Sequence, residues 1–245
     1  MTGIICHFPN GHFMKNITTL IKSNRIYFFG LCIILFTGCV LLIIQGKAAA
    51  FIPLDGIHPF WLNVFFINYT FMGNGIFALS LITVLYIYYG KKQQAYTLLS
   101  SFLISGFTIQ VIKNLVNTSI PKLYLEAGTY LQFTDGVALS ADSGSPSAHT
   151  ATAFAIATVL AMLIKHKKMQ WLIVMAAAGV GFSRMYLAGH FLIDVITGAT
   201  IGTVSGLTAV YLAPYKAGIQ RSFTKLQDIR DKTATTPADI QPATG

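Results

Sequence analysis

The sequence predicts an all-α fold, a polytopic membrane helical bundle of about six transmembrane helices with one further helix in the membrane interface. Hydrophobic residues make up 54% of the 245 residues, charged residues make up only 10%, and the mean hydropathy is +0.62. A soluble domain normally carries about 25% charged residues. The apolar residues fall into runs that approach the roughly 20 residues a membrane-spanning helix needs, and most basic residues fall between these runs.

Six apolar stretches are predicted to span the membrane. The first is followed by three alanines, as in a cleaved signal peptide, but its apolar run exceeds the usual length of about 7–15 residues, so we expect a retained helix. A shorter, aromatic stretch, Ile57–Tyr69, predicts an interfacial helix with Trp61 at the depth of the lipid headgroups. The six predicted spans are Tyr27–Gln45, Phe71–Tyr89, Tyr96–Val116, His149–Ile164, Trp171–Leu187 and His190–Leu212.

The cysteines indicate neither a disulfide nor a thiolate metal site. Cys32 and Cys39 lie seven residues apart in the first span, about 10 Å along a helix axis, which is too far for a disulfide. The sequence has no C-x-x-C pair. We therefore expect these two residues to be buried as small apolar side chains.

The basic residues orient the predicted bundle. Thirteen of the 17 Lys and Arg fall on one side of the six spans: in the N-terminal segment, in the turns after the second and fourth spans, and in the C-terminal tail. This side is predicted to be cytoplasmic by the positive-inside rule. The net charge of +9 then reflects topology, and no nucleic-acid partner is expected. The predicted organisation is a cytoplasmic segment 1–26, a membrane domain 27–213, and a cytoplasmic, disordered tail 214–245.

Polar residues gather at the opposite ends of the predicted spans. Lys113 lies at the outer end of the third span, His149 begins the fourth, Arg184 lies near the end of the fifth, and His190 begins the sixth. Ionisable residues at membrane depth are costly and are usually functional. Because four separate spans contribute to the same membrane face, we expect one site there.

The residue types at this face suit chemistry on a phosphate. Hydrolysis of a phosphate ester needs a nucleophile, a proton for the leaving oxygen, and positive charge around the phosphate oxygens. His190 and Asp194 share a helix face at a spacing of four, so Asp194 can orient one ring nitrogen and leave the other free to attack. His149 can supply the proton, and the cations Lys113 and Arg184 can hold the phosphate.

The start of the fourth span adds a place for an anion, because the amides around Ser147 and Ala148 lie at a helix N-terminus. This chemistry requires no metal and no cofactor. A zinc site made of the two histidines and Asp194 is an alternative that Arg184 disfavours.

Two segments, Pro146-Ser-Ala-His149 and Ser183-Arg184-x5-His190-x3-Asp194, resemble the second and third motifs of the type 2 phosphatidic acid phosphatase family, whose fold is shared with the vanadium haloperoxidases. The third motif matches completely. The second has Ala148 where the family usually has glycine. The family's first motif is a lysine, six residues, then Arg-Pro; Lys113 and Pro121 fit it, but Ile120 occupies the arginine position.

The resemblance implies that His190 is the nucleophile and forms a phosphohistidine, that Asp194 is its partner, and that His149 is the general acid. It also implies phosphate binding by Lys113, Ser147, Ala148 and Arg184. Lys122 is a candidate to replace the arginine absent at Ile120.

The expected function is that of an integral membrane lipid phosphatase, with its active site on the periplasmic or extracellular side of a bacterial inner membrane and both termini in the cytoplasm. Candidate substrates are isoprenyl diphosphates, phosphatidic acid, phosphatidylglycerol phosphate, and the glycolipid phosphates of a bacterial envelope. Two alternatives remain: a phosphotransferase in which a lipid hydroxyl replaces water, and a lipid-binding or transport module on the same scaffold. The sequence leaves the oligomeric state open.

Overall fold

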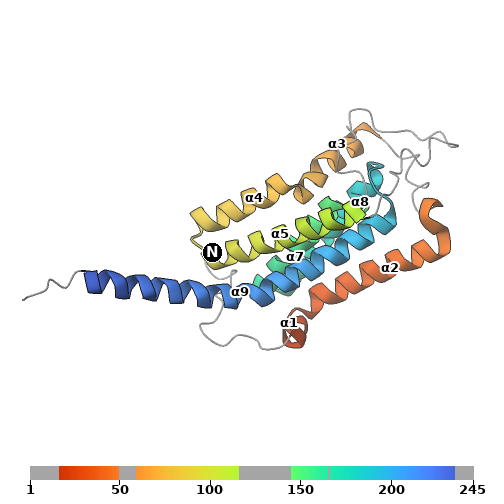
Figure 1. Ribbon diagram of the computed structural model, residues 1–245. Coiled ribbons are helices and arrows are strands. Elements are labelled where there is room, and N and C mark those ends of the chain that lie inside the picture. Colours follow the sequence, from red (N-terminus) through yellow and green to blue (C-terminus); the bar gives the residue numbers. More distant parts are fainter. Residues whose placement is uncertain (1–16, 50–58, 116–144, 165, 235–245) are drawn as a thin grey trace, which may run out of the picture.

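A computed structural model describes residues 17–49, 59–115, 145–164 and 166–234 of the chain (Figure 1). The described residues form helices and no strand, which confirms the predicted all-α fold class. The elements are α1 (Ile17–Ser23), α2 (Arg25–Ala49), α3 (Phe60–Tyr69), η2 (Thr70–Gly73), α4 (Gly75–Thr83), η3 (Val84–Tyr88), α5 (Lys92–Leu115), α7 (Ala148–Leu163), α8 (Lys167–Tyr186) and α9 (Leu192–Ala234).

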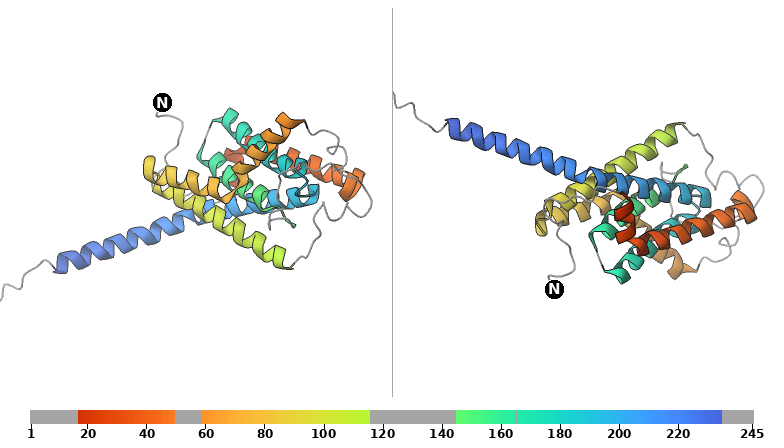
Figure 2. Two further views of the ribbon diagram at one scale, coloured as in Figure 1. Left: turned by 90° about the horizontal axis from the view of Figure 1, so that it is seen from above. Right: turned by 90° about the horizontal axis from the view of Figure 1, so that it is seen from below.

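Helix α7 is the central helix of the bundle. It packs against α5, α8 and α9 and also meets η2 and α4, so nearly all of its residues are buried (Figure 2). Its 16 residues extend about 24 Å, which is less than the roughly 30 Å hydrocarbon core of a bilayer. A helix enclosed by its neighbours need not match the thickness of the lipid.

Three helical stretches in the described part of the chain are long and apolar enough to cross a membrane by themselves: Arg25–Gly46, Lys92–Leu115 and Leu192–Ala213. A bent pair, Phe60–Gly73 with Gly75–Tyr88, adds a fourth if the two halves form one span. The remaining predicted spans correspond to α7 and α8. The protein is thus an integral membrane protein in which longer outer helices enclose the short apolar helix α7.

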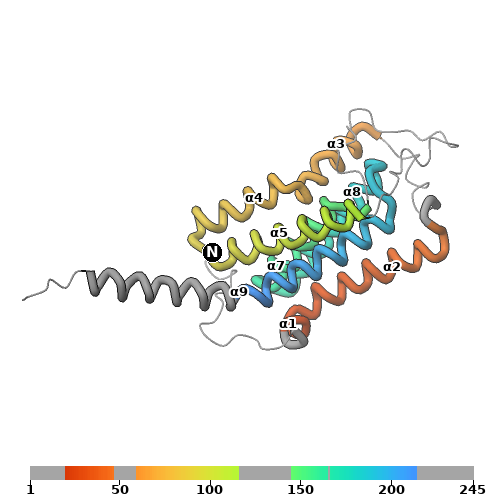
Figure 3. The backbone as a smooth tube through the Cα atoms, in the orientation of Figure 1, coloured from red at the N-terminus to blue at the C-terminus, as the bar shows by residue number. Residues whose placement is uncertain are grey.

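The predicted second span, Phe71–Tyr89, is not continuous. The helix pair that contains nearly all of it, Phe60–Gly73 and Gly75–Tyr88, is bent by 57°, and the path of the chain turns between α3 and α4 (Figure 3). The break occurs because Thr70–Gly73 forms a 3-10 turn and Asn74 is extended, with its side chain accepting a hydrogen bond from the amide of Ile76 at 3.0 Å. Helix α3 occupies most of the predicted interfacial stretch, but Ile57 lies outside the described residues.

The predicted disordered tail is corrected in part, because α9 continues through residues 214–234. This segment holds three Lys, two Arg and two Gln, which favour helix, and the Thr-Thr-Pro run begins only after it. Residues 235–245 and 1–16 lie outside the described part of the chain, so the remainder of the predicted cytoplasmic segments is not placed.

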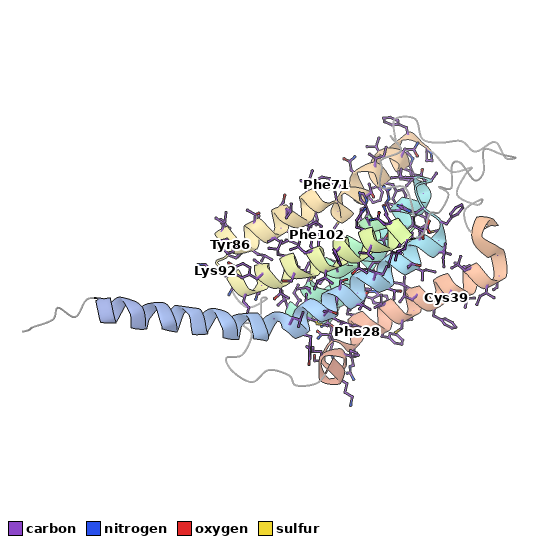
Figure 4. All side chains as sticks on the ribbon, viewed as in Figure 1. Phe28, Cys39, Phe71, Tyr86, Lys92 and Phe102 are labelled. Atoms are coloured by element: carbon purple, nitrogen blue, oxygen red, sulfur yellow. The ribbon has the colours of Figure 1, made fainter. Side chains whose placement is uncertain are left out.

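Cys32 and Cys39 form no disulfide, as expected, but the expectation that they are buried is wrong. Cys32 and Cys39 are both exposed, and Cys39 can be seen on α2 in Figure 4. Helix α2 packs mainly against α8 and α9, so much of its surface has no protein neighbour. At the turn into α5, the Nζ atom of Lys92 lies 5.8 Å from the ring centre of Tyr86, a cation–π contact at the end of the bundle that is predicted to be cytoplasmic (Figure 4).

Candidate active site

The turn after α8 sets the spacing between Arg184 and His190. The amide of Ala188 donates to the carbonyl of Met185 and the amide of Gly189 donates to the carbonyl of Arg184, each at 3.0 Å, which is a Schellman helix end. Ala188 has φ 54°, at the position where glycine is usual. The amide of His190 donates to the same Arg184 carbonyl at 3.2 Å. The five residues between Arg184 and His190 therefore form one closed turn that keeps both residues at the same end of the bundle.

Asp194 is anchored in the first turn of α9. Its Oδ2 atom accepts a hydrogen bond of 2.9 Å from the amide of Phe191, so the carboxylate reaches back to the residue before the helix, as the acidic member of a capping box does. The Nδ1 atom of His190 lies 3.8 Å from the same oxygen, just beyond hydrogen-bond distance. A small rotation of the imidazole would close this gap, because the carboxylate itself is fixed.

The imidazole of His190 is buried and its side chain is 1% exposed. Among the described residues, neither of its ring nitrogens has a hydrogen-bond partner. Burial lowers the pKa of His190 below its ordinary value; the hydrogen-bonding influence of Asp194 opposes this, and the nearby positive charge of Arg184 lowers it further. The ring is therefore neutral at neutral pH and keeps a nitrogen lone pair available for attack.

The start of α7 carries the second predicted motif. Ser147 is the N-cap residue, and its Oγ atom accepts hydrogen bonds from the amide of Thr150 at 3.4 Å and from the hydroxyl of Thr150 at 3.0 Å. Ala148 and His149 are the first two residues of the helix and are half-buried. The first amides of a helix lack partners within it, and together with the helix dipole they favour an anion.

Main-chain and side-chain contacts join the two motifs. The amide of Ser147 donates to the carbonyl of Asp194 at 3.1 Å. The side chain of Ser145 interacts with the carboxylate of Asp194. The start of α7 and the start of α9 are thereby held together, and His149 is carried by the same helix end as Ser147.

Glycines on α9 let the two helices approach closely. A Cβ atom at Gly198 would lie 2.6 Å from the carbonyl oxygen of Ser147, and one at Gly202 would overlap the carbonyl oxygen of Ala151. Gly206 continues the same row against α7. The spacing of four puts these glycines on one helix face. A larger residue at any of them would push the start of α7 away from the start of α9.

Two predicted cations lie near His190. Arg184 is buried, and its guanidinium packs over Gly189, where a Cβ atom would lie 2.9 Å from Nη2. Lys113 is half-buried in the last turn of α5, and its positive charge also acts on His190. Ile120 and Lys122 lie outside the described residues, so the predicted role of Lys122 stays a prediction.

The structure thus gathers seven of the eight predicted site residues at one end of the bundle. The sequence analysis missed Ser145 and Gly198, although the glycine spacing on α9 was a usable signal. It also missed a hydrogen bond of 2.6 Å from the Tyr186 hydroxyl to Asn63 Oδ1, which ties α3 to the end of α8 and has no local signal. In the described ranges, no three His, Cys, Asp or Glu residues cluster as metal ligands would.

This arrangement can attack and stabilise an anionic centre. A neutral imidazole lies beside a fixed carboxylate, and a second histidine begins a neighbouring helix. Two cations and the N-terminus of α7 supply positive potential. These are the elements of nucleophilic catalysis on a phosphate group.

Comparison with known proteins gives matches over this same region. A profile of the PAP2 superfamily matches residues 76–217. The chain is 24% identical over 148 residues to the bacitracin transport permease protein BcrC of Bacillus licheniformis, which covers 60% of this chain and 72% of that relative. It is 30% identical over 93 residues to the undecaprenyl-diphosphatase BcrC of Bacillus subtilis (strain 168), which covers 37% of this chain and 47% of that relative.

Two solved structures share the fold. LpxE of Aquifex aeolicus superposes with a TM-score of 0.58 at 24% identity, covering 67% of this chain and 94% of that one. A transmembrane PAP2 type phosphatidylglycerolphosphate phosphatase from Bacillus subtilis superposes with a TM-score of 0.55 at 24% identity, covering 77% of this chain and 94% of that one. The membrane bundle described above is therefore a known architecture.

Proposed function

The chain belongs to the PAP2 superfamily, as its motifs led us to expect, and from this membership we propose that it is a membrane lipid phosphatase that cleaves a phosphate or diphosphate ester through a phosphohistidine on His190. The observation that carries the proposal is the buried imidazole of His190. Its two ring nitrogens lack partners among the described residues, and the fixed Asp194 carboxylate lies 3.8 Å away. Such a group is costly to bury, and a role in catalysis explains why it is there.

The proposed reaction has two steps. In the first, the unprotonated nitrogen of His190 attacks phosphorus, the bond to the leaving oxygen breaks, and that oxygen takes a proton from His149. In the second, His149 removes a proton from water, the resulting hydroxide attacks phosphorus, and inorganic phosphate leaves His190. Asp194 stabilises the positive charge that develops on the imidazole.

Phosphate binding is proposed for the residues around this centre. Arg184 and Lys113 would neutralise the charge on the equatorial oxygens, and the amides near Ser147 and Ala148 would donate to one of them. Burial of the Arg184 guanidinium supports this, because electrostatic attraction is stronger away from water. Lys122 is proposed to take the place of the arginine absent at Ile120.

The proposed substrate is a lipid whose phosphate lies at the outer membrane face. The basic turns support a site on the periplasmic or extracellular side, both termini in the cytoplasm, and residues 27–213 as the membrane domain. An isoprenyl diphosphate is the first substrate to test, because one relative is called an undecaprenyl-diphosphatase; phosphatidic acid and phosphatidylglycerol phosphate follow.

A phosphate-release assay on purified protein tests the function. The detergent-solubilised chain is incubated with undecaprenyl diphosphate, phosphatidic acid and phosphatidylglycerol phosphate, each with and without an acceptor lipid that carries a free hydroxyl. We expect inorganic phosphate from at least one substrate without the acceptor, and an acid-labile, base-stable phosphoenzyme that is absent in His190→Ala. Phosphate appearing on the acceptor in place of release identifies the phosphotransferase alternative. No release and no transfer would leave the binding or transport alternative.

A further inference from the structure

The break in the bent helix pair lies against the site. The 3-10 turn Thr70–Gly73 packs on both α7 and α8, the helices that carry the predicted general acid and the predicted arginine. This turn precedes residues 76–217, the part that matches the superfamily profile.

Gly73 makes the closest approach in this turn. A Cβ atom at Gly73 would lie 2.6 Å from the carbonyl oxygen of His149 and 3.0 Å from its carbonyl carbon. On the other side it would lie 2.8 Å from Cγ1 of Val180 on α8. Both contacts are shorter than real Cβ contacts allow, and the first is to backbone, which can move only with the start of α7. Gly73 is itself buried.

The turn is held in place by the residue before it. Tyr69 donates a hydrogen bond of 3.2 Å from its hydroxyl to the carbonyl of Ala176, and a Cβ atom at Gly179 would lie 2.8 Å from that hydroxyl oxygen. Further along α3, Asn63 accepts the hydrogen bond from Tyr186. With α3 fixed to α8 at two points, a side chain added at Gly73 would displace the helix end that carries His149 instead of moving the turn outward.

We propose that Gly73 is a positioning residue for His149: the absence of a side chain at Gly73 lets the 3-10 turn support the backbone of His149 at the depth from which its imidazole protonates the leaving oxygen. This inference rests on the proposed function, since it concerns the acid step of that reaction. Gly73 touches neither substrate nor the reacting atoms. Its effect passes through the backbone of His149.

The test compares two leaving groups. An alkyl phosphate such as phosphatidic acid needs protonation of the leaving oxygen, whereas p-nitrophenyl phosphate releases a stabilised phenolate that needs little protonation. We expect Gly73→Ala to lower kcat on the alkyl phosphate at least about tenfold, which is part of the roughly 10²–10⁴-fold that general acid catalysis contributes, and to lower it much less on p-nitrophenyl phosphate. The basic limb of the pH profile on the alkyl phosphate should shift as well, while KM changes little.

Matched controls separate positioning from general damage. Gly75→Ala lies two residues on, where a Cβ atom would meet only the end of the Phe102 ring at 3.2 Å, and Gly106→Ala adds a methyl group where no atom lies within 4 Å. Both should retain the parent's activity on both substrates. In a His149→Ala background, adding Gly73→Ala should have little further effect, because the acid step is already lost.

A second variant keeps the test decisive if Gly73→Ala accumulates poorly in the membrane. Gly73→Ala with Val180→Ala removes the obstacle on α8 and leaves the His149 contact, and it is compared with Val180→Ala alone. Equal losses on the two leaving groups, no loss on either, or a full further loss in the His149→Ala background would each overturn the positioning role. If the parent hydrolyses neither these probes nor the panel of lipids, the proposed function itself fails and the inference fails with it.

Discussion

Buried polar groups lie near both ends of α8. Those at the start of the helix are hydrogen-bonded, whereas the imidazole beyond its other end is not. At the start of α8, the Nε2 atom of Gln170 donates to Asn24 Oδ1 at 2.8 Å and to the carbonyl of Ile164 at 3.1 Å. Beyond its other end, both nitrogens of His190 lie buried without a hydrogen-bond partner in the described part of the chain, and the nearest carboxylate, that of Asp194, is 3.8 Å away.

The difference separates a structural role from a functional one. Gln170 and Asn24 are 146 positions apart, and their hydrogen bond fastens the start of α2 to the turn between α7 and α8. The hydroxyls of Tyr27 and Thr158, 2.9 Å apart, add a second tie between α2 and α7. A satisfied buried group stabilises the fold, whereas an unsatisfied one lowers stability and is retained where it does chemistry. Hydrogen bonds around Gln170 therefore stabilise one end of the bundle, whereas the proposed nucleophile His190 lies at the other end.

The largest expected effect comes from removing the reactive group. His190→Ala should lower kcat by about 10³-fold or more, because the nucleophile is lost. Its unfolding temperature in detergent should fall less than that of Gln170→Ala, since no hydrogen bond to the ring is lost. His166→Ala, an exposed histidine at the other end of α8, is the matched control and should leave activity unchanged. An active His190→Ala enzyme would remove the basis of the comparison.

The second largest effect is expected on the free energy of unfolding, at the end of the bundle that Gln170 stabilises. Gln170→Ala leaves Oδ1 of Asn24 and the carbonyl of Ile164 without the hydrogen bond they accept from Gln170, so the free energy of unfolding should fall by about 1–3 kcal/mol. Thermal unfolding measures the loss, and kcat per folded molecule should stay near that of the parent. Gln93→Ala, an exposed glutamine on α5, should change neither quantity. If Gln170→Ala instead abolished turnover without loss of stability, the two ends would not have separate roles.

The pH dependence of both activity and stability should trace to His190. Because burial lowers its pKa in the folded state, the unfolded chain binds more protons between the folded pKa and about 6.5, and stability is lost as the pH falls through this window. The acid limb of kcat/KM should therefore lie below about pH 6.5. Chemical unfolding at several pH values should show a flatter acid side for His190→Ala. An acid limb above the ordinary histidine value would contradict the direction of the shift.

The smallest expected effect is at the turn between these residues. Ala188 has φ 54°, a conformation that costs a residue with a side chain roughly 1–2 kcal/mol relative to glycine. Ala188→Gly should raise the free energy of unfolding by up to about 1 kcal/mol, as part of this gain is offset by the greater freedom of glycine in the unfolded chain. Activity should change little, since the backbone of Arg184 and His190 keeps its hydrogen bonds. Destabilisation by Ala188→Gly would show that the turn is not strained.

The sequence by itself determined the fold class and the location of the site. Long apolar runs specify membrane helices because a bilayer requires their length and composition, and the basic turns predict their orientation. Once the runs are placed in alternating directions, Lys113, His149, Arg184 and His190 must come to the same end of the bundle. The spacing of His190 and Asp194 also follows from one helical turn.

Only the tertiary structure decided how the helices meet. The contact of Gly73 with the backbone of His149 and the hydrogen bond from Ser147 to the carbonyl of Asp194 join segments far apart in the chain, so no local pattern records them. The exposure of Cys32 and Cys39 was not predicted for a different reason. In a membrane protein both the lipid-facing and the protein-facing sides of a helix are apolar, so hydropathy places the helix in the bilayer but does not tell which of its faces is buried.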